Sequence, residues 1–449
     1  MFQIPTSAQT LLGKFAPTFT RPTYSRWLVW LVAAILTTGH HTISNVLRTV
    51  RSLVPGHAST YHRVFSQRRW SMWTLSRALA QYILSRFVPQ GTVSLAADDT
   101  VEEHPGRKVY GKGRHRDAVR SSHSYTAFRW GHKWIVVSIL VTFPFARRPW
   151  ALPVLVALYR TVGWNKKHHR RHRTPSQFAR KLVAVLLHWF PQRKFILAGD
   201  AALGTHDLAA FAARHSRHLS LVARYHPQAN LFEAPPPRRK GQSGRPRVKG
   251  SRLPKPQEVV SRTRKRRKLW VSWYGGGRRR VEIVTGTGHW YKAGQGLVLV
   301  RWVYVHDLSG THRDDYFFST DPAMTPEELI GTFTGRWSIE VTFQEMRSYA
   351  GLESTRGRSE RTVLRMAPCL FALYSVVAVW YAQLPGGYRL RSPVDWAGKK
   401  DRTFSDAITM VRRWIWDEWI FEGVHQDVAL SIIPRPLREA LVHTLAPCA

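Results

Sequence analysis

Acidic residues stand at three points of the sequence where carboxylates could hold metal ions. These are Asp98 and Asp99 after the short apolar run Thr92–Ala97, Asp200 at the end of the apolar segment FILAGD, and Glu340 farther along. Carboxylates from distant parts of a chain can together hold two Mg²⁺ ions about 3.5–4 Å apart, because Mg²⁺ prefers oxygen ligands. The acids therefore predict phosphodiester chemistry assisted by divalent metal ions.

The neighbouring acids Asp98 and Asp99 are alternatives for one position. Successive residues of a strand point to opposite faces, so only one of the two should face the metals. Asp200 also has a second interpretation, as the N-cap of a helix that starts near Ala201. The residues around Asp98 and Asp200 alone leave both questions open.

The segment around Glu340 carries a sharper pattern, FTGRWSIEVTFQEMR. Phe333, Arg336 and Arg347 lie at offsets −7, −4 and +7 from Glu340, which places all four within roughly 60° on one helix face. An acid between two arginines can bind a metal while the arginines bind phosphates. An ordinary Arg–Glu surface pair, worth a few tenths of a kcal/mol, accounts for Arg336 but not for Arg347.

Charge and composition limit the partners. The chain has 68 Lys and Arg against 28 Asp and Glu, a net charge of +40, so it needs an anionic partner such as nucleic acid. A hydrophobic content of 44% excludes a disordered polycation. The apolar run Trp27–Leu36 is shorter than the roughly 20 residues that span a bilayer, so we expect no membrane. Cys369 and Cys448 form no metal or disulfide pattern, which favours the cytoplasm, in association with the nucleoid.

The elements that must position these acids predict an α/β protein with four regions. Helices are expected at Trp27–Thr37, from a cap at Thr42, and at Ser71–Phe87; strands at Trp134–Phe143 and Phe195–Ala198; and a helix at residues 176–190. The regions are 1–90, a helical DNA-binding or dimerisation unit; 91–224, the first part of a mixed α/β core; 225–322, a β-rich insertion; and 323–449, the second part of the core with C-terminal helices.

The insertion is expected to contain a basic loop followed by strands. Ala234–Lys268 is rich in Pro, Gly, Arg and Lys and is predicted to be mobile. Strands are predicted at Trp270–Trp273, Val281–Thr285, Leu297–Val305 and Tyr316–Ser319, and helices return at about Thr325 and over Val363–Tyr381.

The segment around Glu340 resembles the YREK signature, Tyr-x2-Arg-x3-Glu-x6-Lys, of bacterial insertion-sequence DDE transposases. The order of the Asp-Asp-Thr strand, the FILAGD strand, the β-rich insertion and the RWSIE helix is also similar to that superfamily, from about residue 35 to residue 380. This resemblance implies an RNase H-like catalytic core interrupted by the insertion. It also implies that Asp98, Asp200 and Glu340 bind two Mg²⁺ ions, for which Mn²⁺ can substitute. The Asp-x-Thr phase favours Asp98, with Asp99 as the alternative.

Two signature positions depart from the family pattern. Phe333 stands where Tyr is usual, so a hydroxyl contact to DNA is missing, and Arg347 replaces Lys with the same charge but different donor geometry. The resemblance further implies that water cleaves double-stranded DNA at transposon ends and that the freed 3′-hydroxyl attacks target DNA. Synapsis of two ends implies a homodimer.

Further DNA contacts are expected in the insertion. In relatives that form a hairpin, a flipped base stacks on a tryptophan, and Trp270, Trp273, Trp290 and Trp302 are candidates here unless they pack the insertion's own core. Arg245 and Arg247 lie in a Gly-Arg-Pro-Arg segment that resembles an AT-hook, and the run Arg262–Lys268 suits phosphates generally. The alternative functions are a transposase-derived DNA-binding protein that no longer cuts and a basic RNA-binding protein.

Overall fold

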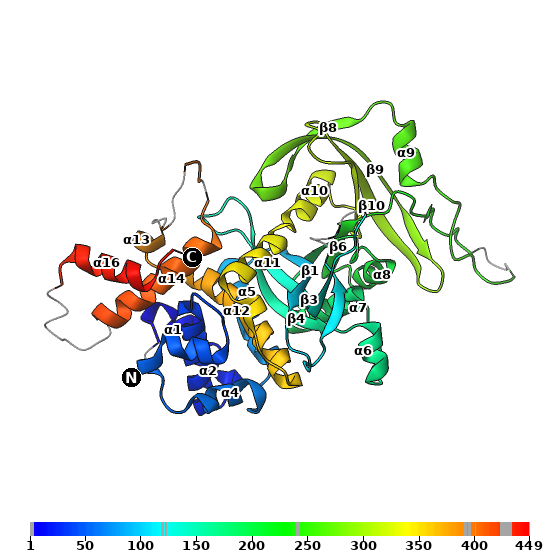
Figure 1. Ribbon diagram of the computed structural model, residues 1–449. Coiled ribbons are helices and arrows are strands. Elements are labelled where there is room, and N and C mark those ends of the chain that lie inside the picture. The colour runs from blue at the N-terminus through cyan, green and yellow to red at the C-terminus, as the bar shows by residue number, and fades with distance from the viewer. Residues whose placement is uncertain are drawn as a thin grey trace.

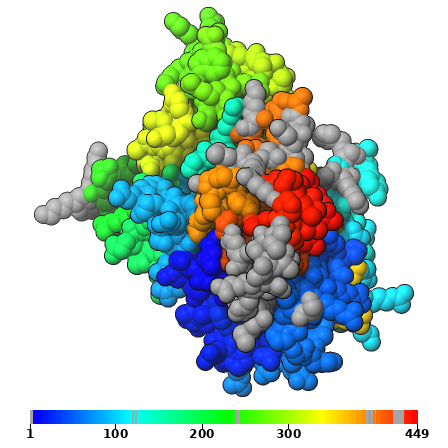
Figure 2. Space-filling view, turned by 90° about the vertical axis from the view of Figure 1, so that its left-hand side faces the viewer, coloured from blue at the N-terminus to red at the C-terminus, as the bar shows by residue number. Residues whose placement is uncertain are grey.

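The structure is a computed structural model of the chain, and it describes residues 4–117, 121, 124–238, 243–389, 393, 397–399, 401–422 and 433–448. A long sheet runs through the molecule (Figure 1). Helices from the beginning and the end of the chain lie together beside it. In the space-filling view the blue N-terminal and red C-terminal helices share one face, and the green to yellow insertion stands at the far end (Figure 2).

The N-terminal region is helical. Its elements are α1 (Thr6–Gly13), η1 (Ala16–Thr18), α2 (Arg21–Leu36), α3 (Ile43–Thr49), η2 (Arg51–Leu53), α4 (Ala58–Ser66) and α5 (Met72–Phe87). The three predicted helices are present as α2, α3 and α5, and two further helices, α1 and α4, were not predicted. The hydroxyl of Thr42 accepts a hydrogen bond from the backbone N–H of Asn45, and Ser71 caps α5 in the same way. The predicted cap at Thr42 is therefore confirmed, and Ser71 is the cap of α5 and not its first residue.

The first part of the sheet is mixed. Its strands are β1 (Val93–Glu103), β2 (Gly113–Arg116), β3 (Phe128–Val141), β4 (Trp150–Tyr159), β5 (Phe195–Gly199) and β6 (Leu219–Arg224). β3 lies antiparallel between β1 and β4, and β1, β5 and β6 are parallel neighbours. The helices of this part are α6 (Val162–Lys167), α7 (Pro175–Trp189) and α8 (His206–Arg214).

Three of these strands, β2, β4 and β6, are absent from the sequence prediction. Pro153 interrupts the apolar run of β4, and a proline is normally excluded from the interior of a sheet. The structure accommodates it where the pairing of β3 and β4 shifts register, between Val137 and Ser138. The bulge removes the need for a ladder hydrogen bond at Pro153.

The insertion holds several strands, and these strands continue the same sheet. Its elements are β7 (Leu231–Phe232), α9 (Pro256–Arg262), β8 (Arg267–Ser272), η3 (Tyr274–Gly276), β9 (Arg278–Lys292), β10 (Gly296–Asp307) and β11 (Asp315–Ser319). β11 pairs with β6 of the core and with β10 of the insertion. The predicted loop Ala234–Lys268 holds α9 and the start of β8, while its residues 239–242 lie outside the described residues.

The segment around Glu340 forms two helices, so the predicted single helix is wrong at this point. α10 (Pro326–Gly335) begins with a capping box between Thr325 and Glu328, and α11 (Ser338–Tyr349) follows after two residues. Arg336 and Trp337 donate to carbonyl oxygens three residues back, both at 3.2 Å, which tightens the backbone between the helices. The remaining elements are η4 (Leu352–Ser354), α12 (Glu360–Gln383), α13 (Gly386–Arg389), α14 (Phe404–Asp417), η5 (Glu418–Glu422) and α16 (Arg435–Leu445).

Helix α12 forms much of the core beside the sheet. It is long and apolar enough to cross a membrane, but 83% of its apolar window is buried inside the protein, as is also found in core helices. At the other end of the chain, the guanidinium of Arg412 in α14 donates to the carbonyl oxygens of Ile35 and Thr37 at 2.6 and 2.9 Å. This contact joins the C-terminal helices to the end of α2.

Glu102 is fully buried in β1 beneath α12. Its carboxylate accepts hydrogen bonds from Trp134 Nε1 and Thr355 Oγ1, both at 2.7 Å. Burial raises the pKa of Glu102 to about 7, although both hydrogen bonds lower it. The unfolded chain releases this proton near pH 4.5, so the folded state becomes less favoured as pH rises from about 4.5 to 7.

We predict that Glu102→Gln removes this pH dependence. The amide NH2 of the glutamine is a donor and faces one of the two donors that the carboxylate accepts from, so the variant loses stability at every pH. Its free energy of unfolding, however, no longer falls between pH 5 and 7. In the wild type, this decrease in the free energy of unfolding is at most about 3 kcal/mol. Chemical denaturation across this range measures it, with Glu103→Gln at the exposed end of β1 as the control. An unchanged slope in Glu102→Gln would contradict the prediction.

Candidate active site

Asp98 and Asp200 are brought together by the parallel pairing of β1 and β5. Ala96 is paired with Ala198 in this register, so Asp98 and Asp200 each lie two residues beyond a paired position. β1 does not end at its acids, as the sequence predicted, but runs on to Glu103. Asp98 therefore lies inside a strand, at the level where β5 ends and where the neighbouring backbone leaves space for a side chain.

Arg336 connects Asp98 with Glu340. Its Nη1 donates to Asp98 Oδ2 at 2.5 Å and its Nη2 donates to Glu340 Oε1 at 2.8 Å. The side chain of Arg336 is 9% exposed, that of Asp98 16% and that of Glu340 47%. The guanidinium is thus held between a buried acid and an accessible one, at the junction of α10 and α11.

Burial raises the pKa of Asp98 to about 7. Arg336 acts in the opposite direction, and the nearby charges of Asp200 and Asp99 raise the pKa further. Arg336 in turn interacts electrostatically with Asp98, Glu340 and Asp200. Its guanidinium is therefore common to all three acids of the predicted triad.

Asp99 faces a different environment. Its carboxylate forms an ion pair with Lys133 of β3 at 2.8 Å. Asp98 and Asp99 pair with Val136 and Ile135 respectively, so they point to opposite faces of the sheet, as strand geometry requires. Of the two alternatives, Asp98 is the acid that contacts the Arg336–Glu340 pair.

Asp200 also orders the turn that follows β5. Its Oδ1 accepts a hydrogen bond from the backbone N–H of Leu203 at 3.1 Å, and its carbonyl oxygen accepts from Gly204 at 2.9 Å. The alternative interpretation of Asp200 as the N-cap of a helix starting near Ala201 is wrong, because α8 starts at His206 with Thr205 as its N-cap and Asp200 orders only the turn before it. The second carboxylate oxygen remains for another role.

Family models match most of the chain. Residues 14–280 match a model described as "DDE superfamily endonuclease", and residues 295–378 match one described as "Archaeal putative transposase ISC1217". The chain belongs to the DDE superfamily of endonucleases. The first match contains Asp98 and Asp200, and the second contains Glu340.

Comparisons with individual proteins find only a distant likeness. Over 99% of this chain and 82% of the other, the DDE endonuclease is similar to a piggyBac transposase solved by cryo-electron microscopy in a synaptic complex with hairpin DNA, with 11% identity and a TM-score of 0.41. A likeness this distant carries no argument about fold or function. No curated protein matches the sequence.

The other signature residues of the DDE endonuclease make contacts within the protein. Phe333 is buried and stacks on Phe317, with ring centroids 4.1 Å apart. Arg347 pairs with Glu353 at 3.3 Å and donates to the hydroxyl of Thr100 in β1. Phe333 thus packs α10 against β11, and Arg347 holds α11 against β1, the strand that carries Asp98.

The tryptophans of the insertion separate into buried and exposed groups. Trp302 and Trp273 are buried, and Trp290 packs against His206, Tyr225 and Phe318. Trp270 is 56% exposed, and the guanidinium of Arg278 lies 5.9 Å from its ring centroid. Of the four candidates, Trp270 is the one whose ring is accessible to a displaced base.

The basic loop of the insertion lies open to solvent. Arg245 and Arg247 are exposed in a segment without regular structure, next to Gly244, whose φ is +87°. The predicted run Arg262–Lys268 is divided between the end of α9 and the start of β8. These residues are placed on the surface, but their contact with DNA stays a prediction.

Tyr274 and Glu353 are site residues that the sequence did not reveal. Tyr274 lies in η3 of the insertion, and its pKa is raised by burial and by the charge of Asp315, with a smaller contribution from Glu340. Glu353 joins Arg347 to Arg129 of β3. No spacing rule connects these residues, because both depend on how distant strands pack.

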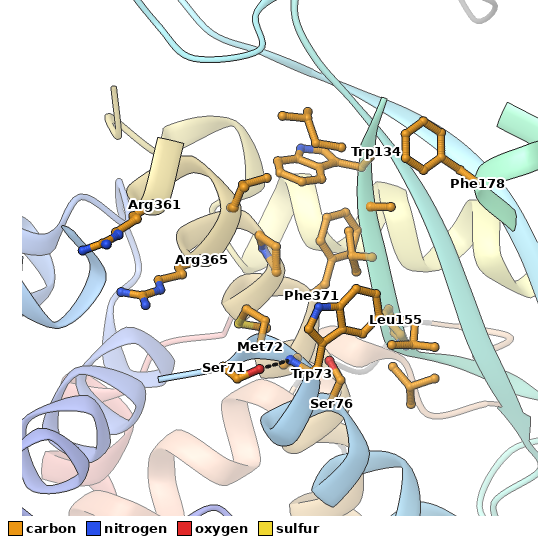
Figure 3. Close-up of a pocket in the computed structure, with 18 of the residues that line it drawn as sticks. Ser71, Met72, Trp73, Ser76, Trp134, Leu155, Phe178, Arg361, Arg365 and Phe371 are labelled. Atoms are coloured by element: carbon orange, nitrogen blue, oxygen red, sulfur yellow. Dashed lines mark hydrogen bonds between the residues drawn. The ribbon is translucent and has the colours of Figure 1, made fainter. Parts of the chain in front are cut away.

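A cavity of about 580 Å³ lies elsewhere, between α5, β4 and α12 (Figure 3). Its lining is mainly apolar and includes Trp73, Leu155 and Phe371, with Arg361 and Arg365 at one side. Arg365 donates to backbone carbonyl oxygens, so its charge is already used within the protein. None of the three acids lines this cavity, which separates it from the candidate active site.

We predict that Arg336→Met destabilises the protein by about 3 kcal/mol at pH 8, because Asp98 is left buried beside Asp200 without a counter-charge. The loss shrinks toward pH 6 as Asp98 takes up a proton. Chemical denaturation measures both values, and exposed Arg214→Met should stay within about 0.5 kcal/mol. In a double-mutant cycle, Asp98→Asn should recover part of the loss. Additive effects would show that the pair is not coupled.

Proposed function

We propose that this DDE endonuclease is a transposase that cleaves double-stranded DNA at transposon ends and joins the freed 3′-hydroxyl to target DNA. The observation that supports it is that Arg336 contacts both Asp98 and Glu340, while the pairing of β1 with β5 sets Asp200 at the level of Asp98. Three acids from β1, the end of β5 and α11 converge at one edge of the sheet. A surface ion pair would not require two further acids around the same arginine.

The arrangement of strands also supports an RNase H-like core. Three antiparallel strands, β4, β3 and β1, continue into the parallel strands β5 and β6, with helices packed against them. The insertion elements from β7 to β11 separate Asp200 from Glu340 along the chain. This order is the one that the resemblance to insertion-sequence transposases implies.

The donor chemistry of the three carboxylates fits Mg²⁺ or Mn²⁺. Within the described residues no group of three or more His, Cys, Asp or Glu side chains is arranged as a metal site. The reason is visible in the geometry, because the guanidinium of Arg336 supplies the positive charge between Asp98 and Glu340. A bound cation would therefore compete with Arg336 for the charges of Asp98 and Glu340.

When bound, two divalent ions would activate water and stabilise the leaving oxygen at the scissile phosphate. Asp98 and Asp200 would supply carboxylate ligands from rigid strands, and Glu340 would supply the third carboxylate from α11. Arg336, once released from an acid, can bind a DNA phosphate through the same guanidinium. Trp270 would stack a displaced base, and the exposed Arg245 and Arg247 would contact the DNA flank.

Substitution of the triad should separate cleavage from binding. We expect Asp98→Asn, Asp200→Asn and Glu340→Gln each to lower cleavage of transposon-end DNA by about 1,000-fold or more, since removing a catalytic metal ligand raises the barrier by several kcal/mol. DNA affinity without metal should change little. Cleavage of labelled ends with Mg²⁺ measures the first effect, and gel shifts in EDTA measure the second.

Asp99→Asn is the matched control for Asp98→Asn. Because Asp99 pairs with Lys133 on the opposite face, its substitution should lower cleavage less than tenfold. Full cleavage by Asp98→Asn together with loss in Asp99→Asn would reverse the assignment. Full activity in all three triad variants would instead favour a DNA-binding protein that does not cut.

The pH profile should reflect Asp98. Its pKa is raised to about 7, and only the ionised carboxylate binds a cation, so binding of Mn²⁺ below saturation should rise steeply between pH 6 and 8. Titration calorimetry at each pH measures this binding without DNA. More Mn²⁺ should move the midpoint to lower pH, because the cation competes with the proton. A midpoint near pH 4 would contradict the prediction.

A further inference from the structure

The start of β3 extends beyond the rest of the sheet as a two-stranded ribbon. β1 ends at Glu103, opposite Gly131, and the pairing with β4 begins only at Lys133. Before these points the ladder of β3 is with β2, and one further hydrogen bond joins the backbone N–H of His104, just after β1, to the carbonyl oxygen of Trp130 at 3.1 Å. We call residues 113–116 and 128–130 the ribbon. The backbone N–H of Asp117 donates to the carbonyl oxygen of Ala127 and continues its pairing at the outer end.

One face of the ribbon is aromatic and basic. Arg114 is paired with Trp130, and Arg116 with Phe128, so the four side chains share a face. The Arg114 guanidinium lies 4.2 Å from the centroid of the Phe128 ring. Phe128 is 47% exposed and Trp130 is 60% exposed. Large aromatic rings this open to water in a stable β ribbon favour a partner that covers them.

The opposite face of the ribbon is anchored to the helix that carries Glu340. Arg129 pairs with Asp117 at 2.6 Å and with Glu353 at 3.1 Å. Glu353 also pairs with Arg347 of α11, which lies seven residues, or about 10 Å along the helix, from Glu340. Both acids of this network thus face away from Phe128 and Trp130, and the outer face keeps its positive charge.

This chemistry selects an occupant. Guanidinium groups bind phosphates, and an exposed indole offers a flat surface to any base. Bases inside a duplex already stack on their neighbours, so a ring on a ribbon gains most from an unpaired base. A net charge of +40 adds general attraction for DNA. An acidic protein partner would satisfy the arginines but would leave both rings without a stacking partner.

We propose that the ribbon binds a single-stranded DNA segment next to the cleavage point, with Trp130 stacked on a base and Arg114 and Arg116 on phosphates. This inference rests on the proposed function and names a substrate feature for it, an unpaired flank. The Arg129–Glu353–Arg347 network sets the distance between that flank and Glu340. The ribbon is separate from Trp270, which lies on β8 of the insertion.

The test uses the full chain in EDTA, so that DNA stays uncut. Fluorescence anisotropy compares a blunt transposon-end duplex with the same duplex carrying a single-stranded tail. The wild type should prefer the tailed DNA. Trp130→Ala should lose about tenfold or more in affinity for tailed DNA and little for blunt DNA, whereas Trp130→Phe keeps most of the preference. Trp73→Ala, at an exposed tryptophan beside α12, is the matched control and should keep it.

The arginines give a second, independent measurement. Arg114→Gln with Arg116→Gln should weaken binding of tailed DNA and reduce the slope of log affinity against log salt by about one to two. Unfolding curves that match the wild type exclude a folding defect, and Trp130→Phe keeps the test decisive if Trp130→Ala is unstable.

Three results would overturn the inference: no preference for tailed DNA in the wild type, an equal loss for both DNAs in Trp130→Ala, or a change of self-association without a change in DNA binding. The proposed function is tested separately from the ribbon inference. If the triad variants cleave normally while the tail preference depends on Trp130, the catalytic proposal fails and the ribbon inference stands. If cleavage depends on the triad but substitution of Trp130 and the arginines has no effect, the ribbon inference fails and the catalytic proposal stands.

Discussion

The need to neutralise a carboxylate inside the protein governs the arrangement of this molecule. Asp98 lies in a central strand with Asp200 beside it, and water cannot screen their mutual repulsion there. A positive charge must lie between them and Glu340, and in this structure it belongs to Arg336. The break between α10 and α11, the packing of Phe333 and the anchoring of Arg347 all serve to bring that guanidinium to the acids.

The same requirement connects folding with activity. An arginine between acids stabilises the protein before any cation binds, and a cation must then compete with it. In the function proposed above, the metal-bound site would differ from this one in the position of the Arg336 side chain and in the protonation of Asp98. A scaffold of paired strands is suited to this exchange, because β1 and β5 hold their acids in place whichever positive charge lies between them.

Local rules recovered many of the helices and strands but not their assembly. Thr42, Ser71 and Thr325 marked helix starts because a cap acts within three residues, and the strands of the insertion followed from their apolar runs. β4 was missed because Pro153 lies in it at a bulge. The single helix through Glu340 was wrong because 100° per residue assumes an uninterrupted backbone, whereas Arg336 and Trp337 tighten it. The contacts of Glu353 and Tyr274 depend on strand packing, which no spacing in the sequence encodes.

The pairing of β6 with β11 has a consequence for how the molecule can move. Backbone hydrogen bonds run from β6 of the core through β11 and β10 to β9, so these strands of the insertion and the core form one sheet. Rotation of the insertion as a rigid body would break a row of these bonds at once.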